Sequence, residues 1–260
     1  GVSKVFKAGG AQGIAAVAYG TQTIPKCSKV VGPGSPWVGA AKRLCSHLID
    51  VGTPAGPSEL IVLADDTADG RLAALDLIIE SEHGPDSSAF LVTWSRKVAE
   101  DAMQAIPEFW KQMGAQRVSY SSTVLEGPMG GIVLARDEEE AIAFCNDYAP
   151  EHLGVHSDEP FQYLGRLENA GEILLGRHTP PTLGNFTIGV NHVLPTSGWA
   201  KTGSPLTVHD FMKRTSVAYV TGKAYPEQAK HAEVIARYEG FDGHANAVSE
   251  TRATLLRTNR

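Results

Sequence analysis

Cysteine is scarce in this chain of 260 residues, and its three members, Cys27, Cys45 and Cys145, are widely spaced. An odd number of distant cysteines fits neither a disulfide framework nor a zinc ribbon built from CxxC pairs. We therefore expect reduced thiols without a redox role, as is usual for a protein of the cytoplasm.

Long apolar runs and an excess of positive charge are also missing. The longest apolar stretches, such as residues 61–64, are far shorter than the roughly 20 residues that span a bilayer. The formal net charge of -6 argues against a nucleic-acid partner and against an anionic membrane surface. The expected partner is a small molecule, and the expected location is cytoplasmic.

The remaining composition is typical of a globular protein. The chain is 42% hydrophobic and 20% charged, so it can bury a full core in one or two domains. Gly1 opens directly into a run that resembles mid-domain sequence, with no initiating Met and no leader pattern. We expect the chain to be part of a longer protein.

Short apolar runs alternate with longer helical patterns, which predicts an α/β fold around a mostly parallel sheet. Helices are expected at residues 14–19, 37–48, 70–82, 98–113 and 137–146, and the tail from 208 to 238 is expected to be helical with a break at 222–226. Residues 177–204 carry turn chemistry and are expected to be an irregular, functional loop. The strands are expected at residues 5–8, 29–31, 59–64, 89–93, 131–135, 152–155 and 172–175.

Two glycine-rich turns precede predicted helices, Gly9-Gly10-Ala11-Gln12-Gly13 and Gly32-Pro33-Gly34. Neither matches the GxGxxG dinucleotide fingerprint, so a plain tight turn is one interpretation. The other is that small residues let backbone N–H groups at a helix N-terminus approach a pyrophosphate.

Pairs of acid and imidazole side chains are the candidates for chemistry. Glu80 and His83 are three residues apart on one helical face, where a surface pair is the simpler interpretation. Glu151 and His152 begin a strand, so they point to opposite faces unless the backbone is irregular; near the carboxyl edge of a sheet they could act as acid and base.

Six short motifs follow one another along the chain: Gly9-Gly10-Ala11-Gln12, Gly32-Pro33-Gly34, Ala55-Gly56-Pro57-Ser58-Glu59, Ser81-Glu82-His83-Gly84-Pro85-Asp86, Ala149-Pro150-Glu151-His152-Leu153 and Asn191-His192-Val193-Leu194-Pro195-Thr196. In sequence and in order, these motifs resemble the histidinol dehydrogenase family, and the resemblance covers essentially the whole chain.

The resemblance implies an NAD-dependent, zinc-dependent enzyme that oxidises a small primary alcohol through an aldehyde to a carboxylate. It also implies Rossmann-like parallel-sheet domains and a homodimer in which a small C-terminal helical extension is swapped. By this resemblance, residues 1–58 are part of the second Rossmann-like domain. Residues 59–206 are the segment in which the chain returns to the first Rossmann-like domain, and residues 207–260 are the dimerisation tail.

The implied metal ligands are Glu80, His83, Asn185 and His244, the last from the partner's tail. Two of them depart from the family pattern, because Glu80 replaces a Gln and Asn185 replaces an Asp. The exchange moves one carboxylate across the site and keeps the ligand charge, and zinc accepts both oxygen and imidazole nitrogen.

The remaining implied roles fall on matching positions. Glu151 and His152 match the catalytic pair, with His152 taking the hydroxyl proton and Glu151 activating water. The substrate-binding positions are Ser58, His192 and Glu239, and the cofactor-binding positions are Gly9, Gly10, Gln12, Gly34 and Ser35, where Ser35 replaces the usual Asn.

The departures leave the substrate open. Phe186 replaces a Tyr beside the metal position, and the segments 199–201 and 210–214 resemble paralogues that oxidise other diols, including a sulfonated propanediol. Histidinol and an anionic diol are equally favoured. A non-catalytic paralogue that binds a nucleotide or metabolite is the alternative from another functional class.

Overall fold

A computed structural model describes residues 1–258. By its contacts the chain divides into two compact units, Gly1–Met212 and a second that begins at Lys213. The second unit contains α8 (Tyr225–Tyr238), α9 (Asp242–Asn246) and α10 (Glu250–Thr258). The division into residues 1–58, 59–206 and 207–260 stays a prediction.

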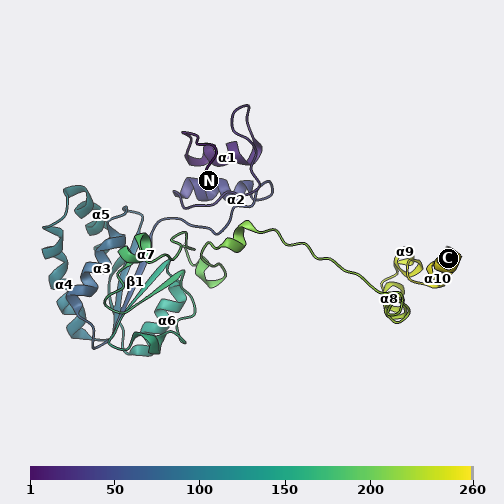
Figure 1. Ribbon diagram of the computed structural model, residues 1–260. Helices are drawn as coiled ribbons and strands as arrows, with labels where there is room; N and C mark the ends of the chain where they lie inside the picture. Colours follow the sequence, from purple (N-terminus) through teal and green to yellow (C-terminus); the bar gives the residue numbers. More distant parts are fainter. Residues whose placement is uncertain (259–260) are drawn as a thin grey trace. The chain divides into compact units, whose positions relative to one another are not determined.

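The first unit is built on five parallel strands, which confirms the predicted α/β class (Figure 1). Their order is β3-β2-β1-β4-β5. This order reverses between β1 and β4, as in doubly wound sheets. The strands are β1 (Glu59–Ala64), β2 (Ser88–Thr93), β3 (Gly130–Leu134), β4 (His152–His156) and β5 (Glu172–Leu175).

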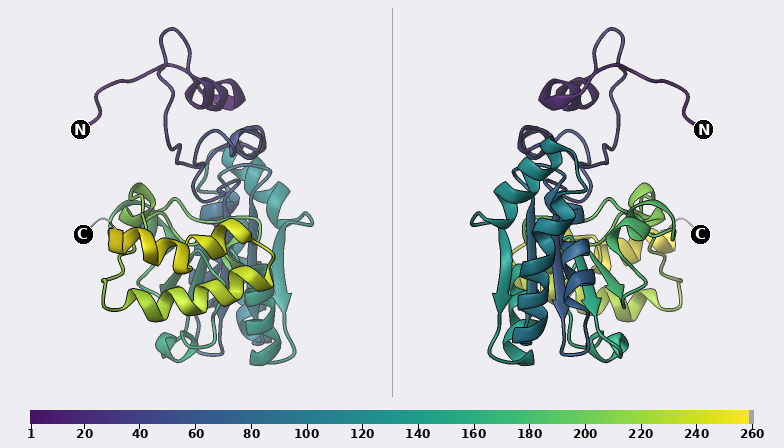
Figure 2. Two further views of the ribbon diagram at one scale, coloured as in Figure 1. Left: turned by 90° about the vertical axis from the view of Figure 1, so that its right-hand side faces the viewer. Right: turned by 90° about the vertical axis from the view of Figure 1, so that its left-hand side faces the viewer.

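Helices cover both faces of the sheet. Figure 1 shows α3 (Gly70–Ser81), α4 (Arg96–Trp110) and α5 (Ala115–Leu125) on one face and α6 (Glu138–Tyr148) on the other. The right-hand view of Figure 2 looks onto the layer of α3, α4 and α5, behind which the strands run. Both faces of the central strands are therefore shielded from water.

The sequence of β1 follows from this double cover. Strand side chains alternate between faces, so Leu60 and Val62 enter the core beneath α3, whereas Ile61 and Leu63 enter the core beneath α6. A strand buried on both sides needs apolar residues at every position rather than at every second one. The uninterrupted run in β1 meets that need.

The N-terminal part contains helices but no strand. Helices α1 (Gly10–Tyr19) and α2 (Pro36–Cys45) pack together over a small apolar cluster that includes Ile14 and Ile49. The strand predicted at residues 5–8 is wrong, and residues 29–31 contribute only an isolated bridge from Lys29 to Asp50. A strand requires a neighbour to pair with, and no described segment pairs along either run.

Tertiary contacts explain a helix that the sequence pattern did not reveal. The segment of α5 is rich in Ser and Thr, which are poor helix formers in isolation. Inside the fold, the buried hydroxyl of Ser121 lies 2.7 Å from that of Ser81 and accepts the Trp110 indole N–H at 2.9 Å. These contacts satisfy a polar side chain in the core and hold the helix in place.

The region predicted to be irregular contains two short helical turns, α7 (Pro181–Phe186) and the 3-10 turn η2 (Trp199–Lys201). Further 3-10 turns are η1 (Pro160–Tyr163) and η3 (Val208–Phe211). The three cysteines are free thiols. Among residues 1–258, no helix combines the length and apolarity needed to cross a membrane.

Candidate active site

The predicted catalytic pair lies at the amino edge of the sheet. Glu151 immediately precedes β4 and His152 is its first residue, paired in register with Leu60 at the start of β1. The expectation that the pair lies near the carboxyl edge is therefore wrong. The reason is topological, because the first residues of parallel strands all lie at the amino edge.

His152 lies beside a carboxylate from the neighbouring strand. His152 and Glu172 are register partners in β4 and β5, and partners in adjacent strands carry their side chains on the same face. The Nδ1 atom of His152 is 2.8 Å from Oε2 of Glu172. Both side chains are buried, and the second oxygen of Glu172 has no hydrogen-bond partner within the part of the chain that the structure describes.

Glu151 points back toward the same imidazole. Ala149 has a left-handed backbone (φ 57°) just before Pro150 and Glu151, so the chain enters β4 irregularly. Oε2 of Glu151 lies 3.8 Å from Nε2 of His152 and accepts the backbone N–H of Glu59 at 3.1 Å. The irregular entry lets two consecutive side chains meet, which a regular strand would prevent.

Three of the four predicted metal ligands come together at the end of α3. The carboxylate of Glu80, which is almost completely buried, lies 3.2 Å from Nδ1 of His83. It also accepts the side-chain amide N–H of Asn185, from α7, at 3.1 Å. Asn185 reaches this position only because residues 181–186 form a helix inside the region expected to be a loop.

Burial and crowding of carboxylates set the proton affinities of the pair. Burial, supported by Glu80 and Glu59 and opposed by His152, raises the pKa of Glu151 to about 8. Burial alone would lower the pKa of His152, but the carboxylates of Glu172, Glu151 and Glu80 outweigh it and raise that pKa. Perturbed acid–base pairs of this kind are common at functional sites.

Glu59 belongs to the site but was not among the predicted residues. One of its carboxylate oxygens accepts the backbone N–H of Ser197 at 2.8 Å, and the other is buried without a partner. Burial raises the pKa of this side chain. Glu59 therefore connects Glu151 to the loop after residue 194, and its place within a matched motif was the available sequence signal.

A cavity of about 350 Å³ is lined in part by the loop after residue 194. It is lined by Ser35 at the start of α2, by Pro57 just before β1, and by Ser197 and Trp199. Lys42 also lines it and donates to the carbonyl of Gly32 at 2.5 Å, which holds the Gly32-Pro33-Gly34 turn in place. The start of α2, which follows the second glycine turn, therefore lines the same cavity as Pro57, the residue before Ser58.

Comparison with known proteins identifies the family. The family model described as histidinol dehydrogenase matches residues 1–252. The chain belongs to the histidinol dehydrogenase family. It is 61% identical to a histidinol dehydrogenase homolog of Colwellia psychrerythraea over its whole length, covering 58% of that protein. It is 48% identical to histidinol dehydrogenase of Synechocystis sp., with 98% of this chain and 58% of that protein covered.

A solved structure of the same family has the same fold. The crystal structure of histidinol dehydrogenase from Elizabethkingia anophelis matches 98% of this chain and 58% of its own, with a TM-score of 0.90 and 33% identity. The chain therefore spans a little under three fifths of the length of these relatives.

The predicted cofactor residues of this family member occupy two helix N-termini. Gly9 caps α1, Gly10 has φ 69° and Gln12 lies in the first turn. Gly34 and Ser35 precede α2, and a Cβ on Gly34 would lie 2.7 Å from Val38, so only glycine fits there. Backbone N–H groups at such ends suit phosphate oxygens.

The predicted substrate residues are not gathered in one place within the first unit. Ser58 immediately precedes β1, next to Glu59, whereas His192 is exposed in the loop after α7. Glu239 caps the C-terminus of α8. The predicted metal ligand His244 lies on α9, with its ring centroid 5.2 Å from that of Phe241 and the two rings tilted by 37°. Both Glu239 and His244 belong to the second unit. Their roles stay predictions.

The donor set at Glu80 is compatible with zinc. A carboxylate, an imidazole and a side-chain amide converge, and zinc accepts oxygen and nitrogen ligands. Within residues 1–258 no group of three or more His, Cys, Asp and Glu side chains could hold a metal ion. The side chain of Asn185 would be the third ligand beside Glu80 and His83, and the role of these residues as zinc ligands stays a prediction.

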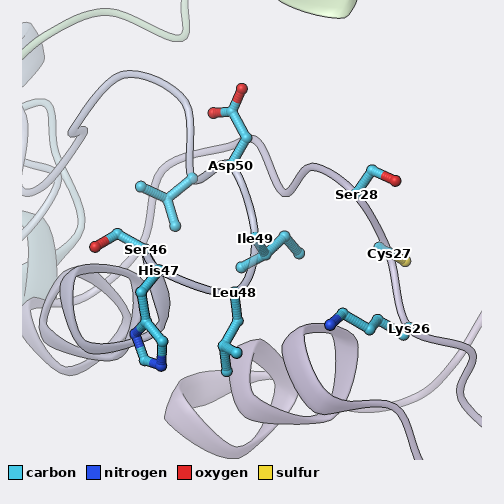
Figure 3. A pocket seen from close by; sticks show the side chains of 9 residues that line it. Lys26, Cys27, Ser28, Ser46, His47, Leu48, Ile49 and Asp50 are labelled. Atoms are coloured by element: carbon cyan, nitrogen blue, oxygen red, sulfur yellow. The ribbon is translucent and has the colours of Figure 1, made fainter. Parts of the chain in front are cut away.

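A larger hollow lies on the N-terminal helices and contains none of the predicted site residues. Lys26, Cys27, His47 and Asp50 are among the residues that line it (Figure 3). Figure 3 shows Asp50 and His47 pointing in opposite directions, so these side chains do not converge on one ligand. The amino edge of the sheet remains the candidate site.

Proposed function

We propose that this protein takes part in NAD-dependent and zinc-dependent oxidation of a small primary alcohol through an aldehyde to a carboxylate. The observation that carries the proposal is the buried Glu151–His152 pair, within electrostatic reach of Glu80 at the trio of Glu80, His83 and Asn185. Membership of the histidinol dehydrogenase family supports it.

In the first oxidation, His152 removes the hydroxyl proton of the alcohol. The O–H bond breaks and an N–H bond forms at the imidazole; NAD+, when bound, would accept the hydride from the same carbon. General-base catalysis of this kind contributes roughly 10²–10⁴-fold to a rate. Burial of His152 keeps bulk water away from the proton-transfer step.

In the second oxidation, Glu151 acts on water. Its carboxylate removes a proton from a water molecule that adds to the aldehyde; a second NAD+, when bound, would accept the hydride of the resulting hydrate. Since burial raises the pKa of Glu151 to about 8, its carboxylate is a stronger base than an ordinary Glu. The product is a carboxylic acid.

Glu80, His83 and Asn185 would hold the zinc, together with His244 from the tail of a partner subunit. A bound zinc ion would supply positive charge that orients the alcohol oxygen and favours loss of its proton. The proximity of these side chains supports the assignment, because Nδ1 of His83 and the side-chain amide of Asn185 lie 3.2 and 3.1 Å from the Glu80 carboxylate.

The first test is zinc content of the purified protein by elemental analysis, compared with His83→Ala and with His178→Ala, an exposed histidine, as the matched control. About one zinc per chain that is lost only in His83→Ala supports the metal assignment. NADH formation is then followed with histidinol and with a sulfonated propanediol, which separates the two substrate classes. Absence of zinc and of turnover with both alcohols would instead favour a binding role.

A further inference from the structure

Glu172 lies in the candidate site, but none of the roles proposed above involves it. Its carboxylate is the partner of His152 at Nδ1, opposite the nitrogen that faces Glu151. An imidazole whose Nδ1–H donates to a carboxylate carries its lone pair on Nε2. The arrangement thus leaves Nε2 as the basic atom, on the side where Glu151 lies.

The carboxylate of Glu172 is fixed by packing. Its side chain is 7% exposed. One carboxylate oxygen lies within hydrogen-bond distance of His152, and the other has no hydrogen-bond partner among the described residues. Gly184 of α7 lies against it, because a Cβ built there would meet the two carboxylate oxygens at 3.0 and 3.1 Å. Glu172 is therefore held between His152 and the helix that carries Asn185.

We propose that Glu172 is a positioning residue that holds the imidazole of His152 in the Nδ1–H tautomer, with Nε2 free to accept the alcohol proton. The inference rests on the proposed function. When the hydroxyl proton moves to Nε2, the imidazole becomes a cation, and the adjacent carboxylate of Glu172 stabilises it. The orienting acid of a catalytic triad acts in the same way.

The charges that face His152 come from several elements. Glu172 belongs to β5, Glu151 precedes β4, Glu80 ends α3 and Glu59 begins β1. Only Glu172 is within hydrogen-bond distance of the ring, at 2.8 Å, whereas Glu151 is at 3.8 Å. Substitutions of Glu172 should therefore change the tautomer of His152 more than substitutions of the other three carboxylates.

Two substitutions separate charge from hydrogen bonding. Glu172→Gln keeps an acceptor oxygen for Nδ1–H but removes the charge, whereas Glu172→Ala removes both. Glu168→Gln is the matched control, because Glu168 is exposed and lies on the loop just before β5. Long-range ¹H–¹⁵N spectra of ¹⁵N-histidine-labelled protein report the tautomer, and His152→Asn identifies the signal of His152.

We expect the Nδ1–H tautomer in the wild-type protein and in Glu172→Gln, and a mixture of tautomers in Glu172→Ala. In the zinc-loaded enzyme, Glu172→Gln should lower kcat on the order of 10-fold or more, with a smaller effect on KM. The acidic limb of its pH–rate profile should move to lower pH by about one unit or more, because losing the charge weakens the base. Glu168→Gln should leave all three readouts unchanged.

A wild-type His152 in the Nε2–H form, or an unchanged tautomer in Glu172→Ala, would overturn the inference. A fall in kcat without any movement of the pH profile in Glu172→Gln would also overturn it, because a merely structural role gives that result. The tautomer is measured without turnover. A protein that shows the expected tautomer but oxidises no alcohol would therefore contradict the proposed function and leave the positioning of His152 intact.

Discussion

The two ends of the parallel sheet carry two buried polar clusters that differ in how completely their atoms are paired. At the amino edge, Glu59 and Glu172 each have a buried carboxylate oxygen without a hydrogen-bond partner among residues 1–258. At the carboxyl edge, Asp65 accepts hydrogen bonds from Thr67 at 2.6 and 2.8 Å and from the Tyr163 hydroxyl at 3.0 Å. A buried polar atom without a hydrogen-bond partner lowers the stability of the fold, so such atoms indicate a functional site rather than a purely structural cluster.

A buried pair strengthens the carboxyl-edge cluster further. His156, the last residue of β4, lies 2.8 Å from Asp76 of α3, and both side chains are buried. Ligands of doubly wound sheets usually bind at this edge, where the strand order reverses. In this protein the reversal point is filled by a satisfied network, and the perturbed acid–base pair lies at the opposite end. Hydrogen bonding and the topological rule therefore point to opposite edges of the sheet, and we expect the site at the amino edge.

The sharpest test of this comparison is Glu151→Gln at the amino edge. Oxidation of the aldehyde should fall by roughly 10²–10⁴-fold, because the amide cannot take a proton from water. Thermal stability at pH 8 should stay the same or rise, since a carboxylate whose pKa is raised to about 8 by burial is replaced by a neutral group. Single-turnover kinetics measure the rate of aldehyde oxidation, and thermal melting measures the stability. A large loss of stability would show that Glu151 is a structural residue.

The matching test at the carboxyl edge is His156→Ala. Removing one member of a buried pair leaves Asp76 uncompensated and should cost about 3–5 kcal/mol of unfolding free energy. Denaturant titration measures this loss. Activity per folded molecule should be preserved at low temperature, and a selective loss of turnover with full stability would mean that the carboxyl edge contributes to the chemistry.

A smaller effect at the same edge is expected for Tyr163→Phe. This change removes one hydrogen bond to a carboxylate, which is worth about 1.5–3 kcal/mol. Burial would raise the pKa of Asp65, but hydrogen bonds from Ser157, Thr67 and Tyr163 outweigh it and lower that pKa. The stabilisation is therefore present above the ordinary pKa and is lost as the pH falls through the lowered value.

The difference in stability between wild type and Tyr163→Phe should accordingly shrink on acidification, as measured by chemical unfolding at several pH values. A difference that stays constant down to acid pH would show that Asp65 is not the group responsible.

The smallest effect is expected for Glu59→Gln, and its pH dependence has the opposite sign. Burial raises the pKa of Glu59 above its ordinary value of 4.5, so the folded state binds more protons and stability falls as the pH rises through the raised value. The amide removes this cost and keeps an acceptor for Ser197. Melting temperatures of variant and wild type should agree near pH 4 and diverge by a few degrees at pH 8, with the variant higher.

Much of the sheet could be predicted because each central strand has its own local signature. The bounds of β1 and β5 match the prediction residue for residue, and β2, β3 and β4 match to within a residue at each end. Apolar runs of β-branched residues between turns were sufficient there. Residues 5–8 include the strand-forming Val5 and Phe6 but have no described neighbour to pair with, and α5 lacks a helical pattern, so local sequence misled in both cases.

The candidate site divides in the same way. Glu151, His152 and His83 lie in motifs that can be matched one by one, Glu80 immediately precedes one of these motifs, and the structure places the four residues near one another. Glu172 carries no such signal, because its importance arises from its register with His152 in the adjacent strand. Strand order and register depend on contacts between distant segments, which one sequence does not display.

The sequence by itself determined the α/β class, the positions of the core strands and the segments that carry the acid and imidazole side chains, because these follow from local periodicity and motif. Only the tertiary structure decided which edge of the sheet holds them, which carboxylate lies beside His152 and which polar atoms stay unpaired. Those properties depend on strand order, register and burial, and such features exist only when distant parts of the chain pack together.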